Sequence, residues 1–89
     1  MRKLILTANV EDFVVRYYKT TAEDENGEKF YGVYAARYAG DNFIDENESG
    51  GIFNDSAAVD EIIQKLAQGE TLPFLMCEVL DEICSEIYF

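Results

Sequence analysis

The sequence has no histidine and no tryptophan, and its 89 residues include one proline and two cysteines. Without histidine, the commonest general base and metal ligand of proteins is missing. Ser49, Ser56 and Ser85 have no evident basic neighbour in the sequence that would activate them as nucleophiles. Pairs of carboxylates occur, but they arise by chance when 18 residues are acidic. We therefore expect a protein that is not an enzyme and that needs no cofactor.

Basic residues are scarce as well, with 7 Lys and Arg against 18 Asp and Glu, a formal net charge of −11 and a pI near 4.1. This charge opposes direct binding to nucleic acid or to an anionic membrane, because like charges would have to be brought together. It favours a basic protein partner. The simpler alternative is that the charge keeps a small protein in solution.

Long apolar runs are missing too, and Leu4-Ile5-Leu6 is far too short for a signal segment or a membrane span. We therefore predict a cytoplasmic protein with no membrane contact. Hydrophobic residues form 48% of the chain and aromatic residues 13%, which predicts a packed core. At this length the core is a single domain, residues 1–89.

The two cysteines, Cys77 and Cys84, are seven residues apart in a segment with helical periodicity. This spacing is too long for a disulfide along one helix, and no C-x-x-C motif is present. The sequence therefore predicts buried free thiols rather than a metal or redox site.

The clearest structural signal is a hairpin over residues 13–38. Two runs rich in β-branched and aromatic residues flank Asn26-Gly27, a pair typical of tight turns. A register with Gly27 in a bulge pairs Tyr18 with Tyr34 and avoids placing two arginines opposite each other. In this register one face of the hairpin is the main candidate for burial, although it also carries the charged side chain of Arg16. That face holds Val14, Tyr18, Ala22, Phe30, Tyr34 and Tyr38.

Shorter strands are predicted on both sides of the hairpin. Residues 3–8 read as a strand inside a sheet, and residues 9–12 as the turn that follows it. The polar interval 39–51 contains Phe43 and Ile44, which either form one more strand or pin a loop to the core. Ile52-Phe53 is predicted as a brief edge strand.

Two helices end the chain. The first begins with Asn54 as its cap, carries Val59, Ile62, Ile63 and Leu66 on one face, and ends at Gly69 in a left-handed cap. The second starts at 71–73, with Pro73 in its first turn. Its apolar stripe is Leu75, Met76, Val79, Leu80, Ile83, Cys84 and Ile87. We expect an α+β fold: an antiparallel sheet of three to four strands followed by two antiparallel helices on one face.

One segment, residues 45–56, partly follows a calcium-loop pattern. Oxygen-bearing side chains stand at its first, third and fifth positions, and glycine stands at the sixth. The predicted ligands are Asp45, Asn47, Ser49 and Gly51. Ser56 occupies the twelfth position, where a bidentate Glu belongs, so a solvated acidic loop is the competing interpretation.

Several short motifs also resemble a known protein family. They are Arg16-Tyr17-Tyr18, Tyr31-Gly32-Val33, the stretch 59–66, Glu70 and Pro73. The chain resembles a family of short uncharacterised proteins from Clostridia and related Firmicutes, and departs from it at Leu72 and in residues 41–51. The resemblance implies the same α+β fold and a bacterial cytoplasmic origin. Because that family has no assigned activity, it implies no functional residue.

Taken together, the residues predict an acidic protein-interaction module, in its strongest form a regulator or inhibitor that imitates nucleic acid in a basic groove. This form requires the acids to cluster on the surface. The candidate contacts are Asp41, Asp45, Glu46, Glu48, Glu78, Asp81, Glu82, Glu86, Tyr17 and Tyr31. The alternatives are a structural homodimer built on an uncovered sheet face or edge, and a calcium-binding module.

Overall fold

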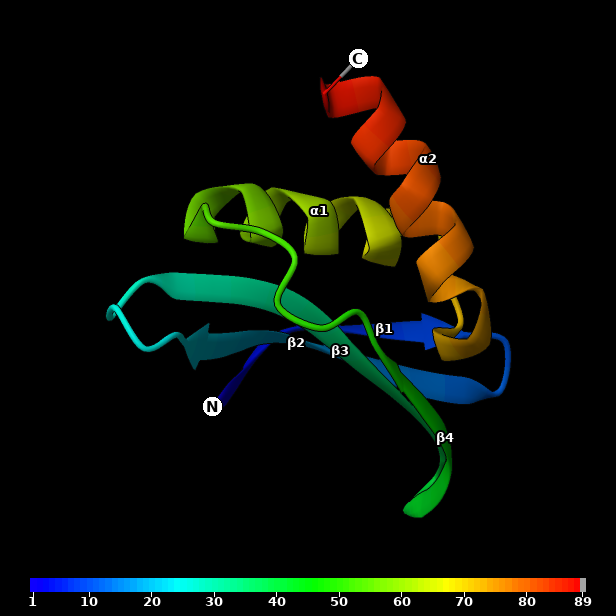
Figure 1. The fold of residues 1–89 in the computed structure, drawn as a ribbon. Coiled ribbons are helices and arrows are strands. Elements are labelled where there is room, and N and C mark those ends of the chain that lie inside the picture. The colour runs from blue at the N-terminus through cyan, green and yellow to red at the C-terminus, as the bar shows by residue number, and fades with distance from the viewer. Residues whose placement is uncertain (89) are drawn as a thin grey trace.

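One antiparallel sheet, with its strands in the order β1-β2-β3-β4, forms one layer of the molecule and lies below the helices in Figure 1. The structure is a computed structural model that describes the backbone of residues 1–88 and the side chains of residues 1–83. The strands are β1 (Arg2–Val10), β2 (Phe13–Glu23), β3 (Lys29–Ala39) and β4 (Asn42–Glu48), and the helices are α1 (Ser56–Gln68), the short η1 (Pro73–Leu75) and α2 (Met76–Tyr88). The predicted α+β class, a sheet followed by two helices, is confirmed.

The central hairpin pairs in the bulged register. Tyr18 faces Tyr34, and Glu23 faces Lys29. Gly27 adopts a φ of +80°, a conformation that side chains rarely tolerate. The Asp24 carboxylate accepts hydrogen bonds from two backbone amides of the turn, each at 2.9 Å. These contacts fix the loop length and hence the register.

The prediction of which sheet face is buried was wrong. The face under α1 carries Val15, Tyr17, Val33 and Ala35, each with 0% exposure. The predicted face points away from the helices, although Tyr34 on it is only 7% exposed, and we call it the open face. Burying it would have taken the Arg16 guanidinium out of water without a carboxylate partner, whereas the cations of the opposite face, Lys19 and Arg37, pair with Asp60 and Asp45.

The outer strands are longer than expected. β1 extends to Val10, so the turn into β2 is reduced to Glu11 and Asp12. A bulge between Leu4 and Leu6 lets Ile5 and Leu6 both pack against the core. The predicted fourth strand is confirmed as β4. Beyond β4, Phe53 forms a single bridge to Tyr31 of β3 in place of an edge strand.

Helix α1 packs as its periodicity predicted, with Val59, Ile62, Ile63 and Leu66 buried. The predicted N-cap was wrong, whereas Gly69 is the C-cap as predicted but does not adopt the left-handed conformation. The N-cap is Asp55, whose carboxylate accepts hydrogen bonds from the amides of residues 57 and 58. Gly69 has a φ of −83°, and the left-handed residue is Glu70, at φ 52°.

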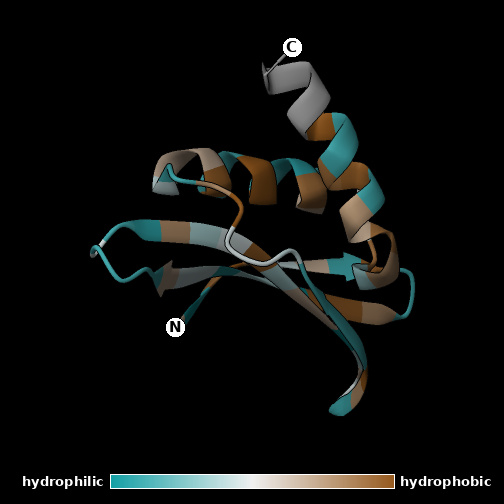
Figure 2. Ribbon diagram, viewed as in Figure 1, coloured by the Kyte–Doolittle hydropathy of each residue, from teal (hydrophilic) through white to brown (hydrophobic). Residues whose placement is uncertain are grey.

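Helix α2 does not run antiparallel to α1. Figure 1 shows it rising steeply away from the sheet past the end of α1. Met76, Leu80 and Ile83 of α2 are buried. Figure 2 shows hydrophobic residues among the lower turns of this helix. Cys77 is exposed, so its predicted burial was wrong, while the Cys84 side chain lies outside the described ones.

Tyr17 ties the sheet to the link between α1 and α2. Its hydroxyl donates to the Thr71 carbonyl at 2.5 Å in the buried interior. Burial, together with the nearby Glu70 carboxylate, raises the pKa of Tyr17 to about 12. The ring therefore stays neutral at physiological pH.

Candidate interaction surfaces

Three of the predicted partner-binding acids are engaged within the chain. Asp45 accepts two hydrogen bonds from the Arg37 guanidinium, at 3.0 and 2.8 Å. Glu46 accepts a hydrogen bond from the Tyr34 hydroxyl, and Glu48 lies 3.6 Å from Arg2. These β4 carboxylates are therefore partly neutralised before any partner arrives.

The structure places part of the predicted calcium loop in a strand. Its ligands were Asp45, Asn47, Ser49 and Gly51. Asp45 and Asn47 lie in an extended strand, where alternate residues are about 6.6 Å apart and do not converge on one point. The Asn47 amide donates to the Pro73 carbonyl, and the Ser49 hydroxyl accepts from the Val33 amide. In the described part of the chain, no three Cys, Asp or Glu side chains gather as a metal site.

The two tyrosines predicted to contact a partner lie on the helix-covered side of the sheet. Tyr17 is fully buried, so this prediction was wrong, and Tyr31 is half-buried and bridged to Phe53. The tyrosines of the open face are Tyr18, Tyr34 and Tyr38. Strand alternation separates these two sets, so choosing the correct buried face would have identified them from the sequence.

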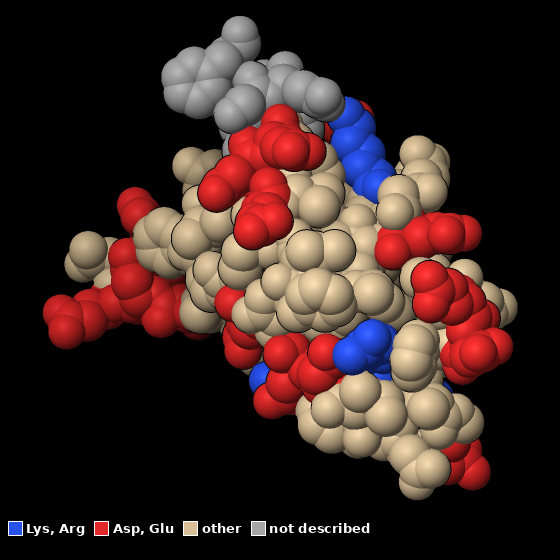
Figure 3. Space-filling view, turned by 90° about the vertical axis from the view of Figure 1, so that its right-hand side faces the viewer, with Lys and Arg blue, Asp and Glu red and all other residues tan. Residues whose placement is uncertain are grey.

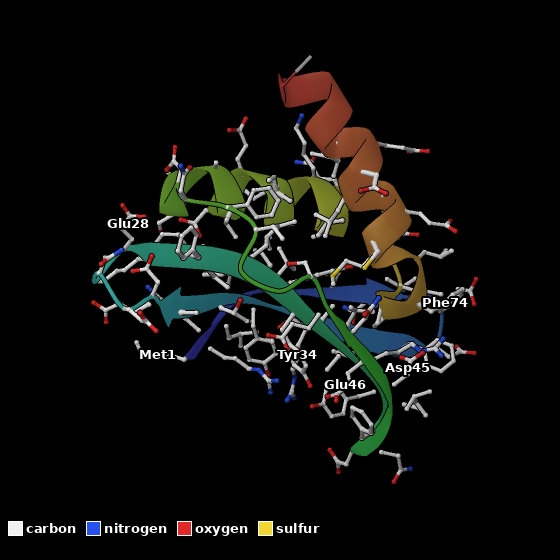
Figure 4. All side chains as sticks on the ribbon, in the orientation of Figure 1. Met1, Glu28, Tyr34, Asp45, Glu46 and Phe74 are labelled. Carbon is white, nitrogen blue, oxygen red and sulfur yellow. The ribbon has the colours of Figure 1, made fainter. Side chains whose placement is uncertain are left out.

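Aromatic and arginine side chains stack on one another across the open face. The Tyr18 and Tyr34 rings lie 5.5 Å apart, and the Arg2 guanidinium lies 3.7 Å above Tyr34. Arg16 lies 4.8 Å from the Tyr38 ring, as cation–π contacts do. Figure 4 shows Tyr34 and Glu46 together beneath the sheet. Burial, and then the hydrogen bond to Glu46, raise the pKa of Tyr34 to about 12.

Charge on the open face sums to zero. The register places Arg2 and Arg16 on it as cations and Glu46 and Glu48 as anions. The whole chain carries −11. Tyrosine and arginine in the absence of excess charge are typical of the centre of a protein interface.

A second surface lies where η1 meets the sheet, and we call Phe13, Phe74 and Leu75 the apolar corner. Phe74 is 60% exposed and Leu75 is 39% exposed. The Arg37 guanidinium lies 4.6 Å from the Phe13 ring and 5.8 Å from the Phe74 ring, and Asp45 holds it from the side. Figure 4 shows Phe74 at the outer edge of the molecule. The corner is thus an exposed apolar surface that packs around the Arg37 guanidinium.

Carboxylates border this corner. Glu78, Asp81 and Glu82 are three and four residues apart, so they lie on one side of α2, the helix that continues from η1. In the described part of the chain, none of the three forms an ion pair. Figure 3 shows acids in separate groups around an uncharged surface. Asp41 lies apart, in the turn between β3 and β4, and the Glu86 side chain falls outside the described ones.

Within the described residues, no helix is long and apolar enough to cross a membrane. A family model described as a family of unknown function (DUF6514) matches residues 2–86. Neither the search of curated proteins nor the search of solved structures found a match.

Proposed function

The chain belongs to the DUF6514 family, whose function is unknown, and we propose that it is a non-enzymatic protein-interaction module that binds a basic partner protein. The observation that carries this proposal is that the exposed apolar corner is followed along α2 by three carboxylates, Glu78, Asp81 and Glu82, which form no ion pair among the described residues. Because these two features adjoin, one partner surface contacts both.

The chemistry of the corner defines the partner. Phe74 and Leu75 lose water-exposed apolar area when covered, which stabilises a complex by about 25 cal/mol per Å². Glu78, Asp81 and Glu82 attract Lys and Arg side chains and speed the encounter. The matching partner surface therefore carries aliphatic or aromatic side chains next to basic ones.

The inhibitor form of this proposal places the corner over a basic, nucleic-acid-binding surface of the partner. Its stricter version, imitation of a phosphate backbone, requires a continuous row of carboxylates. On the face that Figure 3 shows, the acids form separate groups. The acids of β4 are engaged internally. We therefore propose occlusion through the corner rather than mimicry. The cytoplasm is the proposed compartment, because Cys77 is an exposed free thiol of the kind a reducing compartment maintains.

Affinity capture from a bacterial lysate tests the proposal. The immobilised baits are wild type, F74S/L75S and E78Q/D81N/E82Q. We expect wild type to retain a defined basic protein, identified by mass spectrometry, that both variants lose and that elutes as salt rises.

The matched control bait is E25Q/E28Q/E61Q, which removes three exposed acids away from the corner. It has the same net charge as the α2 variant and should retain the partner. A protein that binds all four baits equally, or that the control loses as completely as the α2 variant does, would rule out the corner as the binding site.

A further inference from the structure

The open face differs electrostatically from the rest of this chain. Two copies of the molecule carry −22 together, twice the −11 of one chain, so they repel each other over most approaches. The open face has equal numbers of cations and anions, and it exposes apolar groups such as Phe43, at 53%. It is therefore a surface on which a second copy meets no net repulsion.

The charges on this face are also ordered across the strands. Ala36 of β3 has two cross-strand neighbours, Arg16 on β2 and Glu46 on β4. One row along, Tyr38 is flanked by Val14 on β2 and by Phe43 on β4. In both rows, complementary side chains lie at equal distances on either side of β3.

A two-fold axis along β3 uses this order. The axis lies between the two sheets and runs parallel to β3. Rotation about it does not change the position of a residue along β3, but it exchanges the β2 side of the sheet with the β4 side. It therefore places β2 of one copy over β4 of the other. Arg16 of each copy then faces Glu46 of the other, and Val14 faces Phe43. Sheets that pack face to face keep their strands aligned within about 30° of each other, which this arrangement satisfies.

We propose that two copies associate face to face through the open face, with Arg16 of one paired to Glu46 of the other. Arg16 stacks on Tyr38 and forms none of the ion pairs of the described residues, so it is available for this contact. Glu46 holds the Tyr34 hydroxyl through one oxygen and keeps the other for the second copy.

Association through the strand edge is disfavoured. The sheet has two edge strands, β1 and β4. β1 begins with Arg2 and Lys3 and is bulged between Leu4 and Leu6, and β4 carries three carboxylates and has an irregular register with β3 between Arg37 and Tyr38. Charged residues and bulges are the features by which edge strands avoid pairing with other chains. The face rather than the edge is therefore the contact.

Light scattering on a size-exclusion column, over a range of protein concentrations, measures the assembly. We expect wild type to rise from 10.1 kDa towards twice that mass as concentration increases. R16E places a second carboxylate against Glu46 of the other copy, and E46R places a second guanidinium against Arg16. Each variant alone should stay monomeric. Circular dichroism shows whether each is folded.

Mixing the two variants is the decisive test of the contact between Arg16 and Glu46. A heterodimer of R16E with E46R places opposite charges at both contacts, so the equimolar mixture should regain the dimer mass. E61R, on the surface of α1, is the matched control for E46R and should dimerise as wild type does.

Wild type that stays at 10.1 kDa up to millimolar concentration would overturn the proposal, as would dimerisation of either folded single variant, or a mixture of folded variants that stays monomeric. This result is independent of the apolar corner. Capture of a basic partner neither requires nor excludes the dimer.

Discussion

At the scale of single residues, Gly32 lies too close to a neighbouring backbone segment to carry a side chain. A Cβ built on it would lie 2.0 Å from the Gly50 carbonyl oxygen, which belongs to backbone and cannot swing aside. We expect G32A to destabilise the fold by about 1–3 kcal/mol, because the segment after β4 has to move off β3. Equilibrium unfolding in urea measures the change.

Gly69 is the control for this substitution. Its φ is −83°, and a Cβ there would meet its nearest neighbour at 3.5 Å, an ordinary contact. G69A should therefore leave the free energy of unfolding nearly unchanged. Equal decreases in the free energy of unfolding for G32A and G69A would contradict the close approach of Gly32 to the Gly50 carbonyl.

Tyr17 predicts a dependence of stability on alkaline pH. Its pKa is about 12 in the folded chain against 10.0 as a free side chain, so the unfolded chain loses the proton first. Below pH 10 both states hold the proton. Above it, the free energy of unfolding falls by as much as about 1.4 kcal/mol per pH unit for this group.

The Y17F variant separates this effect from the titration of other groups. At neutral pH it should lose about 1–3 kcal/mol, because the buried Thr71 carbonyl loses its donor. Between pH 10 and pH 12 its stability should fall less steeply than that of wild type. Parallel curves for the two proteins would show that Tyr17 does not keep its proton in the folded chain.

At the scale of elements, the caps of α1 provide a direct test of the corrected boundary. Asp55 accepts hydrogen bonds at 3.0 and 3.4 Å, while Asn54 is exposed and precedes the cap. We expect D55A to cost about 1 kcal/mol in thermal or chemical unfolding and N54A to cost almost nothing. The reverse order would mean that the helix begins one residue earlier.

Sequence periodicity predicted the elements of this fold better than it predicted their packing. The bulged hairpin and the buried stripe of α1 depend on local spacing, and both are confirmed. The choice of buried face is not local. Both alternating sets of the hairpin are apolar and both contain tyrosines, so the pattern alone does not show that α1 packs on the set with Val15, Tyr17 and Val33.

The candidate sites were only partly predictable for the same reason. Glu78, Asp81 and Glu82 are exposed, as is the apolar corner, but Leu75 was predicted as part of the apolar stripe of the second helix, and Phe74 was not predicted as a surface residue. Their exposure follows from the steep angle of α2, which depends on tertiary packing at its base. Local sequence does not determine that angle.

At the scale of the whole molecule, self-repulsion should weaken the fold at low salt. With a net charge of −11, most carboxylates lie among others of the same sign, and folding brings them closer than the expanded chain does. Salt screens exposed charges over about 10 Å at 0.1 M, so it relieves this repulsion. It also weakens the Arg2–Glu48 pair, but that pair is exposed and worth at most about 1 kcal/mol.

We therefore expect the midpoint of thermal unfolding to rise as sodium chloride increases from about 10 mM to about 300 mM, by about 4–8 °C if the relief is 1 kcal/mol. Scanning calorimetry or circular dichroism measures the rise. In E25Q/E28Q/E61Q the net charge falls from −11 to −8, so the rise should be smaller. Because screening acts on the square of the charge, the two slopes should differ even though the cores are identical. A midpoint that falls with salt in both proteins would mean that attractive pairs outweigh repulsion, and that the acids serve the fold rather than a partner.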